Sequence, residues 1–340
     1  MNLTPEFHNK YEEFRVLEAH TDGEPARIIL SGIPDIEGAT MMEKKQFFME
    51  NCDYIRTSLC FEPRGHKDML CVALVEPVHE EADFGVLFLE SGGVVNMCGH
   101  GAIAAAVAVT EAGLVEMQEP VTHVIFDAPA GMVSIKVNVK NGKAISADLE
   151  NVPTFAYREG LSIEIEGYGS IMYDIEFSGS FCALVDAEQF SIELNGKNAP
   201  VYTEIGMKIM RTLNQEVEVS HPELDIHTID VIDFYQKQSD GKIVNMAVFG
   251  EGQVDRSPCG TGTNAMAAKK YAAGEIAQGD TFEYYSILGC KFTCRIDRTT
   301  KVGSFDAIVP IITGGAYIDG YNCWFIDPDD PFKDGFILGM

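Results

Sequence analysis

Basic residues are scarce in this chain, which has 25 lysines and arginines against 52 aspartates and glutamates in 340 residues. The formal net charge of −27 leaves no basic patch able to dominate the surface potential. This shortage disfavours nucleic acids and anionic membrane surfaces as partners. It favours an acidic, self-repelling surface, so a site for a carboxylate substrate must supply its own local positive potential.

Long apolar runs are also lacking. The longest, residues 102–109, is much shorter than the roughly 20 residues that a membrane-spanning helix needs. The first residues read MNLTPE and show neither the basic nor the apolar stretch of a secretory signal peptide. We therefore expect a cytoplasmic protein without a membrane partner.

The nine cysteines include no C-x-x-C pair, which argues against a dithiol redox protein. Their odd number favours reduced thiols over a disulfide framework. Cys290 and Cys294 are four positions apart, but a metal site would need a second close pair or a nearby histidine. We interpret both, with Cys323, as core thiols. Four more cysteines have apolar neighbours and receive the same interpretation: Cys52, Cys60, Cys71 and Cys182.

The two remaining cysteines each stand in a glycine-rich turn that opens an alanine-rich stretch. Residues 96–106 read NMCGHGAIAAA, and residues 257–268 read SPCGTGTNAMAA. Cys98 aligns with Cys259, 161 positions later, and the glycines and alanines that follow align as well. Apolar, strand-like segments precede both turns. A strand, a turn with cysteine and a helix therefore occur twice, which predicts an internal duplication.

This repeated turn has a chemical consequence. A cysteine at a helix N-terminus has a lowered pKa, because the unpaired backbone N–H groups and the helix dipole stabilise a thiolate. The glycines let backbone N–H groups approach a substrate carboxylate closely. We predict that Cys98 and Cys259 act on opposite faces of an α-carbon, one as proton acceptor and one as proton donor. The alternative is a duplicated fold with inert cysteines.

Two polar residues flank the thiols. His100 lies in the first helical turn after Cys98, where its ring could bind a substrate carboxylate or make only a structural hydrogen bond. Asp255 precedes Cys259 by four positions. Its carboxylate suits a substrate ammonium or iminium group, and the alternative is a turn or helix-capping carboxylate.

Strand-like segments outnumber helical ones, so the expected class is α+β. The spacing predicts helices over residues 42–59 and 202–214, and a hairpin turn at Asn141-Gly142. The Pro/Gly break at residues 127–131 is the best domain boundary. We expect two domains, residues 1–127, completed by about 313–340 from the C-terminus, and residues 128–312.

Residues 97–100 (MCGH) and 255–263 (DRSPCGTGT) resemble the proline racemase family, which includes hydroxyproline epimerases and 3-hydroxyproline dehydratases. Five further runs along almost the whole chain resemble it: residues 20–24, 62–66, 127–131, 285–289 and 330–332. The resemblance implies two pseudosymmetric domains of the diaminopimelate-epimerase type. Each is a strand barrel around a central helix, and the active site lies between them.

The same resemblance implies a homodimer and a mechanism without pyridoxal phosphate, metal or other cofactor. It gives the catalytic roles to Cys98 and Cys259. It assigns substrate contacts to five residues: Gly99, His100, Asp255, Gly260 and Thr261.

The resemblance also bears on the substrate. Dehydratases of the family lack one of the two cysteines, so the presence of both favours racemisation or epimerisation. Hydroxyproline epimerases carry His where this chain has Val231, and proline racemases carry Phe at the positions of Leu70 and Phe249. Val231 and Phe249 thus favour proline, whereas Leu70 and Cys182 depart from the family pattern.

The sequence therefore predicts an isomerase that interconverts L- and D-proline with two cysteine thiols. The alternatives within the family are a 4-hydroxyproline 2-epimerase and a 3-hydroxyproline dehydratase. Two other classes stay open on the residues alone, a dithiol redox protein and a non-catalytic amino-acid-binding protein.

Overall fold

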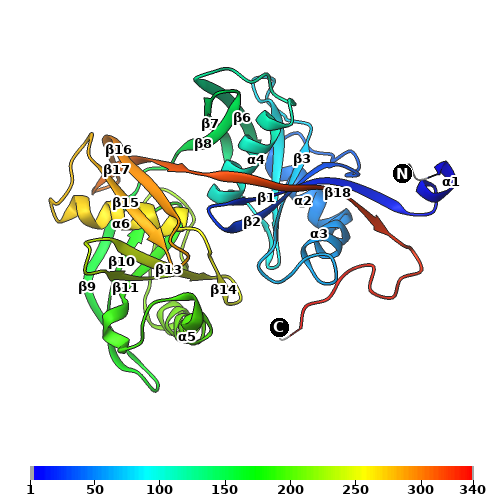
Figure 1. Cartoon of the computed structure of the whole chain (residues 1–340). Coiled ribbons are helices and arrows are strands. Elements are labelled where there is room, and N and C mark those ends of the chain that lie inside the picture. Colours follow the sequence, from blue (N-terminus) through cyan, green and yellow to red (C-terminus); the bar gives the residue numbers. More distant parts are fainter. Residues whose placement is uncertain (1–3, 339–340) are drawn as a thin grey trace. The chain divides into compact units, whose positions relative to one another are not determined.

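The computed structural model in Figure 1 describes residues 4–338. Within them the chain forms two compact units, and each is assembled from separate segments. The first unit contains residues 4–21, 25–147 and 315–338, and the second contains residues 22–24 and 148–314.

The elements of the first unit, with the strands that lead into and out of it, are α1 (Pro5–His8), β1 (Glu12–Thr21), β2 (Glu24–Ser31), α2 (Met41–Asn51), α3 (Asp53–Cys60), β3 (Leu70–Val75), β4 (Phe84–Glu90), β5 (Gly93–Val95), α4 (Gly99–Glu111), β6 (Val121–Ala128), β7 (Gly131–Lys140), β8 (Lys143–Glu150) and β18 (Ala316–Ile326). Those of the second unit are β9 (Phe155–Ile165), β10 (Gly169–Phe177), β11 (Phe181–Asp186), η1 (Ala187–Phe190), η2 (Gly196–Asn198), α5 (Ala199–Glu216), β12 (Ile229–Lys237), β13 (Ile243–Phe249), β14 (Gln253–Val254), α6 (Gly260–Ala272), β15 (Thr281–Ser286), β16 (Lys291–Val302) and β17 (Phe305–Gly314).

The two units repeat one order of strand pairing. In the first, β2 runs parallel to β3, β3 is antiparallel to β4, and β4 is parallel to β6. In the second, β11 runs parallel to β12, β12 is antiparallel to β13, and β13 is parallel to β15. The central helices α4 and α6 follow β5 and β14 at the same place in this order. The predicted α+β class and internal repeat are therefore confirmed.

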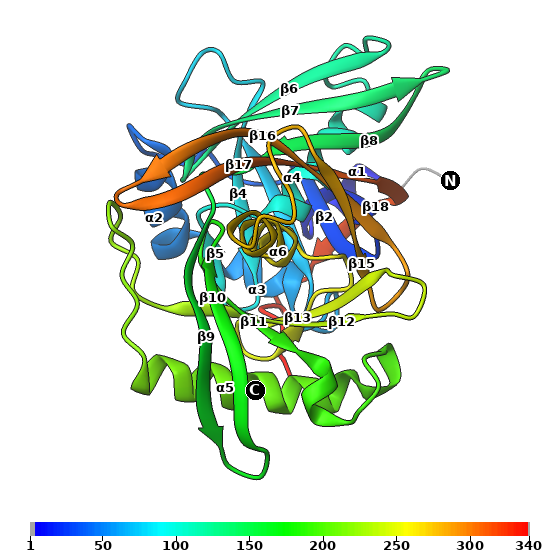
Figure 2. The same cartoon turned by 90° about the vertical axis from the view of Figure 1, so that its left-hand side faces the viewer.

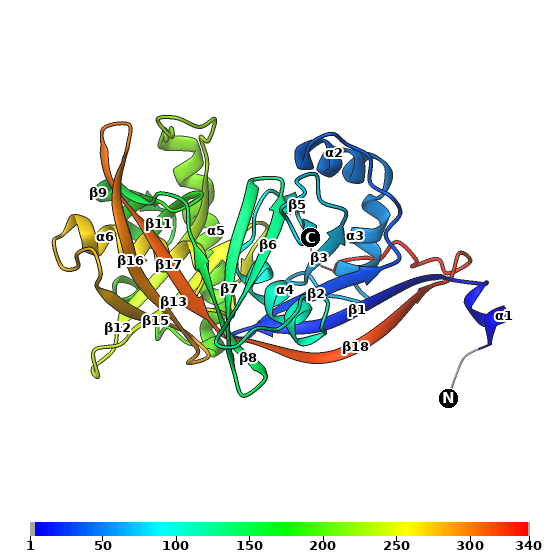
Figure 3. The same ribbon diagram turned by 90° about the horizontal axis from the view of Figure 1, so that it is seen from above.

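Strand β3 shows how the first unit builds its core, because alternate side chains of a strand point to opposite faces. Cys71 and Ala73 belong to an apolar cluster with the helix α3, which contributes Ile55 and Leu59. The intervening side chain of Val72 faces α4 instead. Figure 3 shows α3 and α4 on either side of β3. Two helical layers thus cover the two faces of these strands.

The second unit has the same construction around α6. Figure 2 shows α6 end-on among the strands, with α5 outside them. Ile232 and Phe234 of β12 pack in one cluster with Ile205 and Ile209 of α5. Asp233, between them in sequence, points the other way, toward the beginning of α6. A strand barrel around a central helix, as expected for each domain, is what this unit forms.

The domain boundary expected at residue 127 differs from the observed division. Strands β6 and β7, on either side of that position, pair with each other along their length inside the first unit. Residues 129–130 form the turn of this hairpin. A Pro/Gly break marks a reversal of the chain, and a reversal within a hairpin looks the same in sequence as one between domains.

The helix expected over residues 42–59 is two helices. Cys52 ends α2 with its N–H bonded to Phe48 O at 2.7 Å, and its φ of −129° lies outside the helical range. Its carbonyl then accepts the Ile55 N–H at 2.9 Å as α3 begins. The Asn141-Gly142 hairpin is confirmed, with φ values of 55° and 66°.

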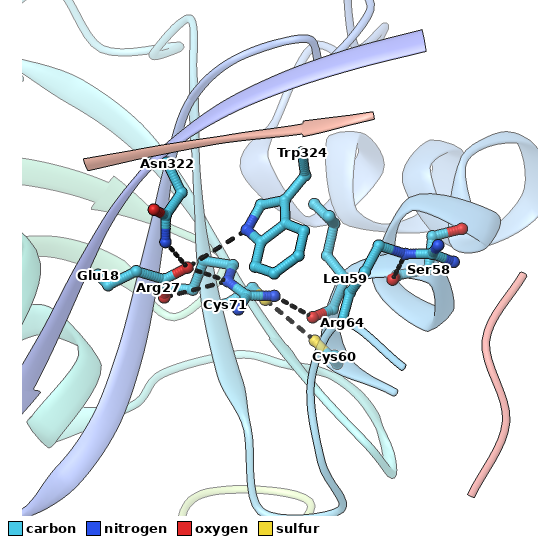
Figure 4. Close-up of polar contacts among 9 residues, drawn as sticks. All are labelled: Glu18, Arg27, Ser58, Leu59, Cys60, Arg64, Cys71, Asn322 and Trp324. Atoms are coloured by element: carbon cyan, nitrogen blue, oxygen red, sulfur yellow. Dashed lines mark hydrogen bonds and ion pairs between the residues drawn. The ribbon is translucent and has the colours of Figure 1, made fainter. Parts of the chain in front are cut away.

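The C-terminal strand returns to the first unit, where β18 pairs antiparallel with β1. Figure 4 shows how a buried arginine joins the two strands. The Arg27 Nε donates to Glu18 Oε1 at 2.8 Å, and its guanidinium stacks over the Trp324 ring at 4.7 Å. Arg27 Nη1 also donates to Leu59 O at 2.6 Å, so one side chain connects β1, β18 and α3.

Cys52, Cys60, Cys71, Cys182 and Cys294 are buried, which confirms their interpretation as core thiols. The interpretation is wrong for Cys290 and Cys323, which are only half-buried. Cys290 lies in the tight turn between β15 and β16, and Cys323 lies on β18 opposite Arg15. Among residues 4–338, no helix is long and apolar enough to cross a membrane.

Candidate active site

The Cys98 turn lies at the start of α4. Cys98 is the residue before the helix, in extended conformation, and its carbonyl accepts the first helical hydrogen bond from Ala102 N–H at 3.0 Å. The amides of residues 99–101 therefore precede the first helical bond and point out of the helix end. A Cβ at Gly101 would lie 2.5 Å from the Leu70 Cδ2 atom, so a side chain there would require Leu70 to move. Glycine thus lets the start of α4 approach β3.

His100 and Thr21 shape the surroundings of Cys98. The His100 Nδ1 atom lies 3.3 Å from the Cys98 Sγ, within hydrogen-bond distance for sulfur. Thr21 Oγ1 donates to His100 O at 2.7 Å and ties the turn to β1. Cys98, Gly99 and His100 are half-buried. An imidazole beside a half-buried thiol can stabilise its thiolate and suits a proton acceptor.

Three successive hydrogen bonds within residues 255–262 stabilise the Cys259 turn. Asp255 Oδ1 accepts the Ser257 N–H at 2.8 Å, and Ser257 Oγ accepts the Cys259 N–H at 3.1 Å. The Cys259 Sγ then accepts the Gly262 N–H at 3.3 Å in the first turn of α6. Asp255 thus acts as a turn carboxylate, the alternative to its predicted contact with the substrate amine. Cys259 has φ +60°, a left-handed conformation that residues other than glycine rarely adopt.

The electrostatic surroundings of Cys259 differ from the sequence-based expectation. Burial raises the pKa of the Cys259 thiol well above its usual range, and the Asp255 and Asp233 carboxylates raise it further. The Gly262 N–H lowers it, as expected of a helix N-terminus, but this effect is smaller than the loss of solvation. The expected lowered pKa is therefore wrong for Cys259. A protonated thiol suits a proton donor.

Apolar side chains lie beside Cys259. Val231 faces Phe249 across β12 and β13, and Val231 also pairs with Cys182 on β11. All three pack in one cluster with Cys259. Gly260 and Thr261, in the first turn of α6, are half-buried. The Cys259 thiol thus lies beside apolar side chains and beside the N–H groups at the start of α6.

The structure groups the sequence-predicted residues by unit. It places Leu70, Cys98, Gly99 and His100 together at the start of α4, and Val231, Phe249, Asp255, Cys259, Gly260 and Thr261 around the start of α6. Among the described residues, no group of three or more His, Cys, Asp or Glu side chains is arranged to hold a metal ion.

Sequence analysis missed a buried carboxylate and two buried polar side chains around the Cys259 turn. Glu24 Oε2 accepts the Arg256 N–H at 2.6 Å, although the two residues are more than 200 positions apart. Asp233 and Asn245 are fully buried below the same turn. The available signal was a polar residue in an otherwise apolar strand segment, since such residues are costly to bury without a partner.

Each of the two units has a cysteine directly before its central helix, so the chain is an α+β protein with a repeated fold and a cysteine at each helix start. The proline racemase family model matches residues 16–337, and the chain belongs to that family. A proline racemase of Clostridioides difficile is 46% identical over 327 residues, which cover 95% of this chain and 98% of that protein. A 4-hydroxyproline 2-epimerase of Streptosporangium roseum is 37% identical, with 96% and 98% covered.

Solved structures agree with this membership. A hydroxyproline epimerase from Agrobacterium vitis with bound trans-4-hydroxy-L-proline has a TM-score of 0.88 at 31% identity, over 97% of this chain and 96% of that one. The predicted family, fold class and isomerase class are confirmed. The chain is more similar to this proline racemase (46% identity) than to this 4-hydroxyproline 2-epimerase (37% identity). This agrees with proline racemase as the main prediction and hydroxyproline epimerase as the alternative.

Proposed function

We propose that this chain is a proline racemase that inverts the α-carbon with two thiols and no cofactor. The observation that carries the proposal is the repeated turn, which puts Cys98 and Cys259 at equivalent helix N-termini in a member of this family. In the proposed reaction, the N–H groups of Gly99, His100, Gly260 and Thr261 bind the substrate carboxylate.

Proton transfer in the proposed reaction needs the two thiols in opposite protonation states. The Cys98 thiolate, stabilised by His100, removes the α-proton from one face. The Cys259 thiol, protonated because of its burial and acidic neighbours, delivers its proton to the other face. Cys98 ends as a thiol and Cys259 as a thiolate, and the enantiomer reacts from that state in the reverse direction.

The preference for proline over hydroxyproline follows from the apolar side chains beside Cys259. Val231 and Phe249 offer no hydrogen-bond partner to a ring hydroxyl, and so favour the unsubstituted ring of proline. Leu70, beside Gly101, is a further apolar residue proposed to contact the substrate. Asp255 accepts a hydrogen bond from the substrate amine. We also propose a homodimer in the cytoplasm.

The test is racemisation of L-proline, followed as loss of optical rotation, by the wild type and single cysteine variants. Cys98→Ser and Cys259→Ser should each lose at least about 1000-fold in kcat, because a serine hydroxyl is too weak a base and acid near neutral pH. Cys323→Ser, the same change at a half-buried thiol on β18, should keep wild-type activity. Full turnover by either turn variant would refute the two-thiol mechanism.

The substrate is tested with the same wild-type enzyme. L-Proline, trans-4-hydroxy-L-proline and trans-3-hydroxy-L-proline are compared by kcat/KM, and proline should be preferred. A higher kcat/KM for the 4-hydroxy compound would replace the racemase by the epimerase. If elimination from trans-3-hydroxy-L-proline has a higher kcat/KM than racemisation of proline, the proposed racemase is instead a dehydratase.

A further inference from the structure

Three buried polar side chains form a continuous hydrogen-bonded group below the start of α6. Tyr284 Oη, from β15, donates to Asp233 Oδ2 on β12 at 2.9 Å. Asn245 Nδ2, from β13, donates to Asp233 Oδ1 at 2.8 Å and to Pro258 O at 2.9 Å. All three side chains are fully buried. The group therefore ends on the backbone of the residue that precedes Cys259.

The Pro258 carbonyl receives a second hydrogen bond, from Thr263 Oγ1 at 3.1 Å. Two donors on one carbonyl hold the peptide plane between Pro258 and Cys259, and a fixed plane restricts rotation about the N–Cα bond of Cys259, which is its φ angle. That angle is +60°, a strained conformation that persists only where the surrounding structure enforces it. The buried group thus bonds the peptide that precedes this strained residue.

Asp233 also lies directly against the helix. A Cβ on Gly262 would come within 2.5 Å of Asp233 Oδ2, so only a glycine fits there. Gly262 is the residue whose N–H binds the Cys259 sulfur. The same carboxyl group thus bonds to Asn245, which holds the turn, and lies beside the residue whose N–H binds the thiol.

The surroundings of the Cys98 turn differ from those of the Cys259 turn. Asp233 lies against Gly262 at the start of α6, whereas the side chains that lie against the equivalent Gly101 of α4 are the apolar Leu70, Val72 and Phe88. The residue 161 positions before Asn245 is Phe84. Cys98 itself has φ −143°, an ordinary extended conformation. Apolar side chains thus stand where Asp233 lies in the second unit, and the buried Thr21 bonds the Cys98 turn through His100 O instead.

We propose that Asp233, Asn245 and Tyr284 are positioning residues that hold the Cys259 thiol in its reactive conformation. This inference rests on the proposed two-thiol function. Its main test is a pair of variants, Asn245→Ala and Tyr284→Phe, each of which removes donors from the group. Tyr202→Phe is the matched control, because Tyr202 is equally buried in the same unit and also loses one hydrogen bond, to Ile192 O.

Kinetics give the first readout. Asn245→Ala should lower kcat for L-proline by about 10- to 100-fold with KM changed by less than about threefold, since small displacements of a reacting group cost rate rather than binding. Tyr284→Phe should lower kcat by about threefold or more. Tyr202→Phe should keep wild-type kcat. If Asn245→Ala does not fold, by circular dichroism, Tyr284→Phe decides.

The second readout needs no turnover. Iodoacetamide labelling of each cysteine is followed by peptide mass spectrometry. Labelling of Cys259 should rise several-fold in both variants, whereas Cys98 and the buried Cys294 should react as in the wild type. Equal acceleration at Cys294 would mean general loosening of the unit and would overturn the inference.

The inference would also be overturned if Asn245→Ala and Tyr284→Phe both kept the wild-type kcat and the wild-type labelling of Cys259. It would be overturned as well if Tyr202→Phe lost as much kcat as Tyr284→Phe. A wild-type enzyme that fails to racemise proline would refute the proposed function alone. The labelling of Cys259 would still decide whether the group positions the thiol.

Discussion

Glu176 is a carboxylic acid inside the second unit. It lies on β10 and is fully buried, and neither of its carboxyl oxygens has a hydrogen-bond partner among residues 4–338. Burial raises the pKa of Glu176 well above its usual range, and the nearby Asp174 carboxylate raises it further. The folded protein therefore keeps a proton on Glu176 at a pH where the unfolded chain has released it. Because the folded state then binds more protons, the contribution of Glu176 to stability falls as pH rises above about 4.5.

Replacement of Glu176 by methionine, of similar length, should stabilise the protein. We expect the free energy of unfolding at pH 5 to rise by about 1–3 kcal/mol, because an unpartnered polar group leaves the interior. The advantage should grow with pH, with a limiting slope of about 1.4 kcal/mol per pH unit. Urea denaturation at pH 5 and pH 7 measures both effects. Glu164→Met, at an exposed position of β9, is the control and should show no such growth. A less stable Glu176→Met variant would contradict the prediction.

Val231 offers a prediction about specificity. A ring hydroxyl buried beside Val231 and Phe249 without a partner should cost about 1–3 kcal/mol, or roughly 10- to 100-fold in kcat/KM relative to proline. Val231→His should narrow or invert this preference, since imidazole can bind the hydroxyl. Val231→Leu should lower both values and leave their ratio nearly unchanged. The measurement is kcat/KM for L-proline and trans-4-hydroxy-L-proline, and an unchanged ratio in Val231→His would show that the hydroxyl lies elsewhere.

The central helices α4 and α6 consist mostly of small residues, because each lies inside a ring of strands. Residues 101–110 of α4 and 262–268 of α6 are buried on all sides of the helix. Amphipathic spacing is therefore absent from both, and alanine and glycine set how closely the strands approach. The two helices differ at one equivalent position. A Cβ added at Gly101 would lie nearest to the flexible end of the Leu70 side chain. A Cβ added at Gly262 would lie nearest to the Asp233 carboxylate, which hydrogen bonds hold in place.

This difference predicts unequal costs for one substitution. Gly101→Ala should be accommodated by rotation of Leu70 and change the free energy of unfolding by less than about 1 kcal/mol. Gly262→Ala should cost about 1–3 kcal/mol, because Asp233 is held by Asn245 and Tyr284 and cannot move without breaking buried hydrogen bonds. Chemical denaturation of both variants measures the costs. Equal values would show that Asp233 moves as easily as Leu70.

Over the whole molecule the net charge of −27 is the dominant long-range term. At 0.01 M salt the Debye length is about 30 Å, and at 0.15 M it is about 8 Å, so added salt screens repulsion between distant carboxylates. With 25 basic residues against 52 acidic ones, repulsive pairs outnumber attractive ones. The apparent Tm should therefore rise by about 2–5 °C between these concentrations of NaCl. Differential scanning calorimetry measures it. An equal osmolality of glycerol, which does not screen charge, separates screening from general solute effects, and a Tm that falls with NaCl would contradict the prediction.

The sequence by itself determined the features that have a local cause. A cysteine followed by glycines and alanines predicts a helix start wherever it occurs, so Cys98 and Cys259 were located at once and the repeat with them. Strands β4 and β13 were visible because apolar, β-branched segments between turn residues need no distant partner to be recognised. The hairpin at Asn141-Gly142 follows from the positive φ that both residues accept.

Only the tertiary structure decided the properties that depend on distant neighbours. The Cys259 thiol has a raised pKa because folding buries it beside Asp233 and Asp255, an effect that outweighs the helix N-terminus visible in the sequence. Glu24 meets Arg256, and β18 returns to β1, through contacts across more than 200 residues. Such contacts leave no periodic signal, because desolvation and hydrogen bonding depend on which groups the folded chain brings together rather than on the residues next to them in sequence.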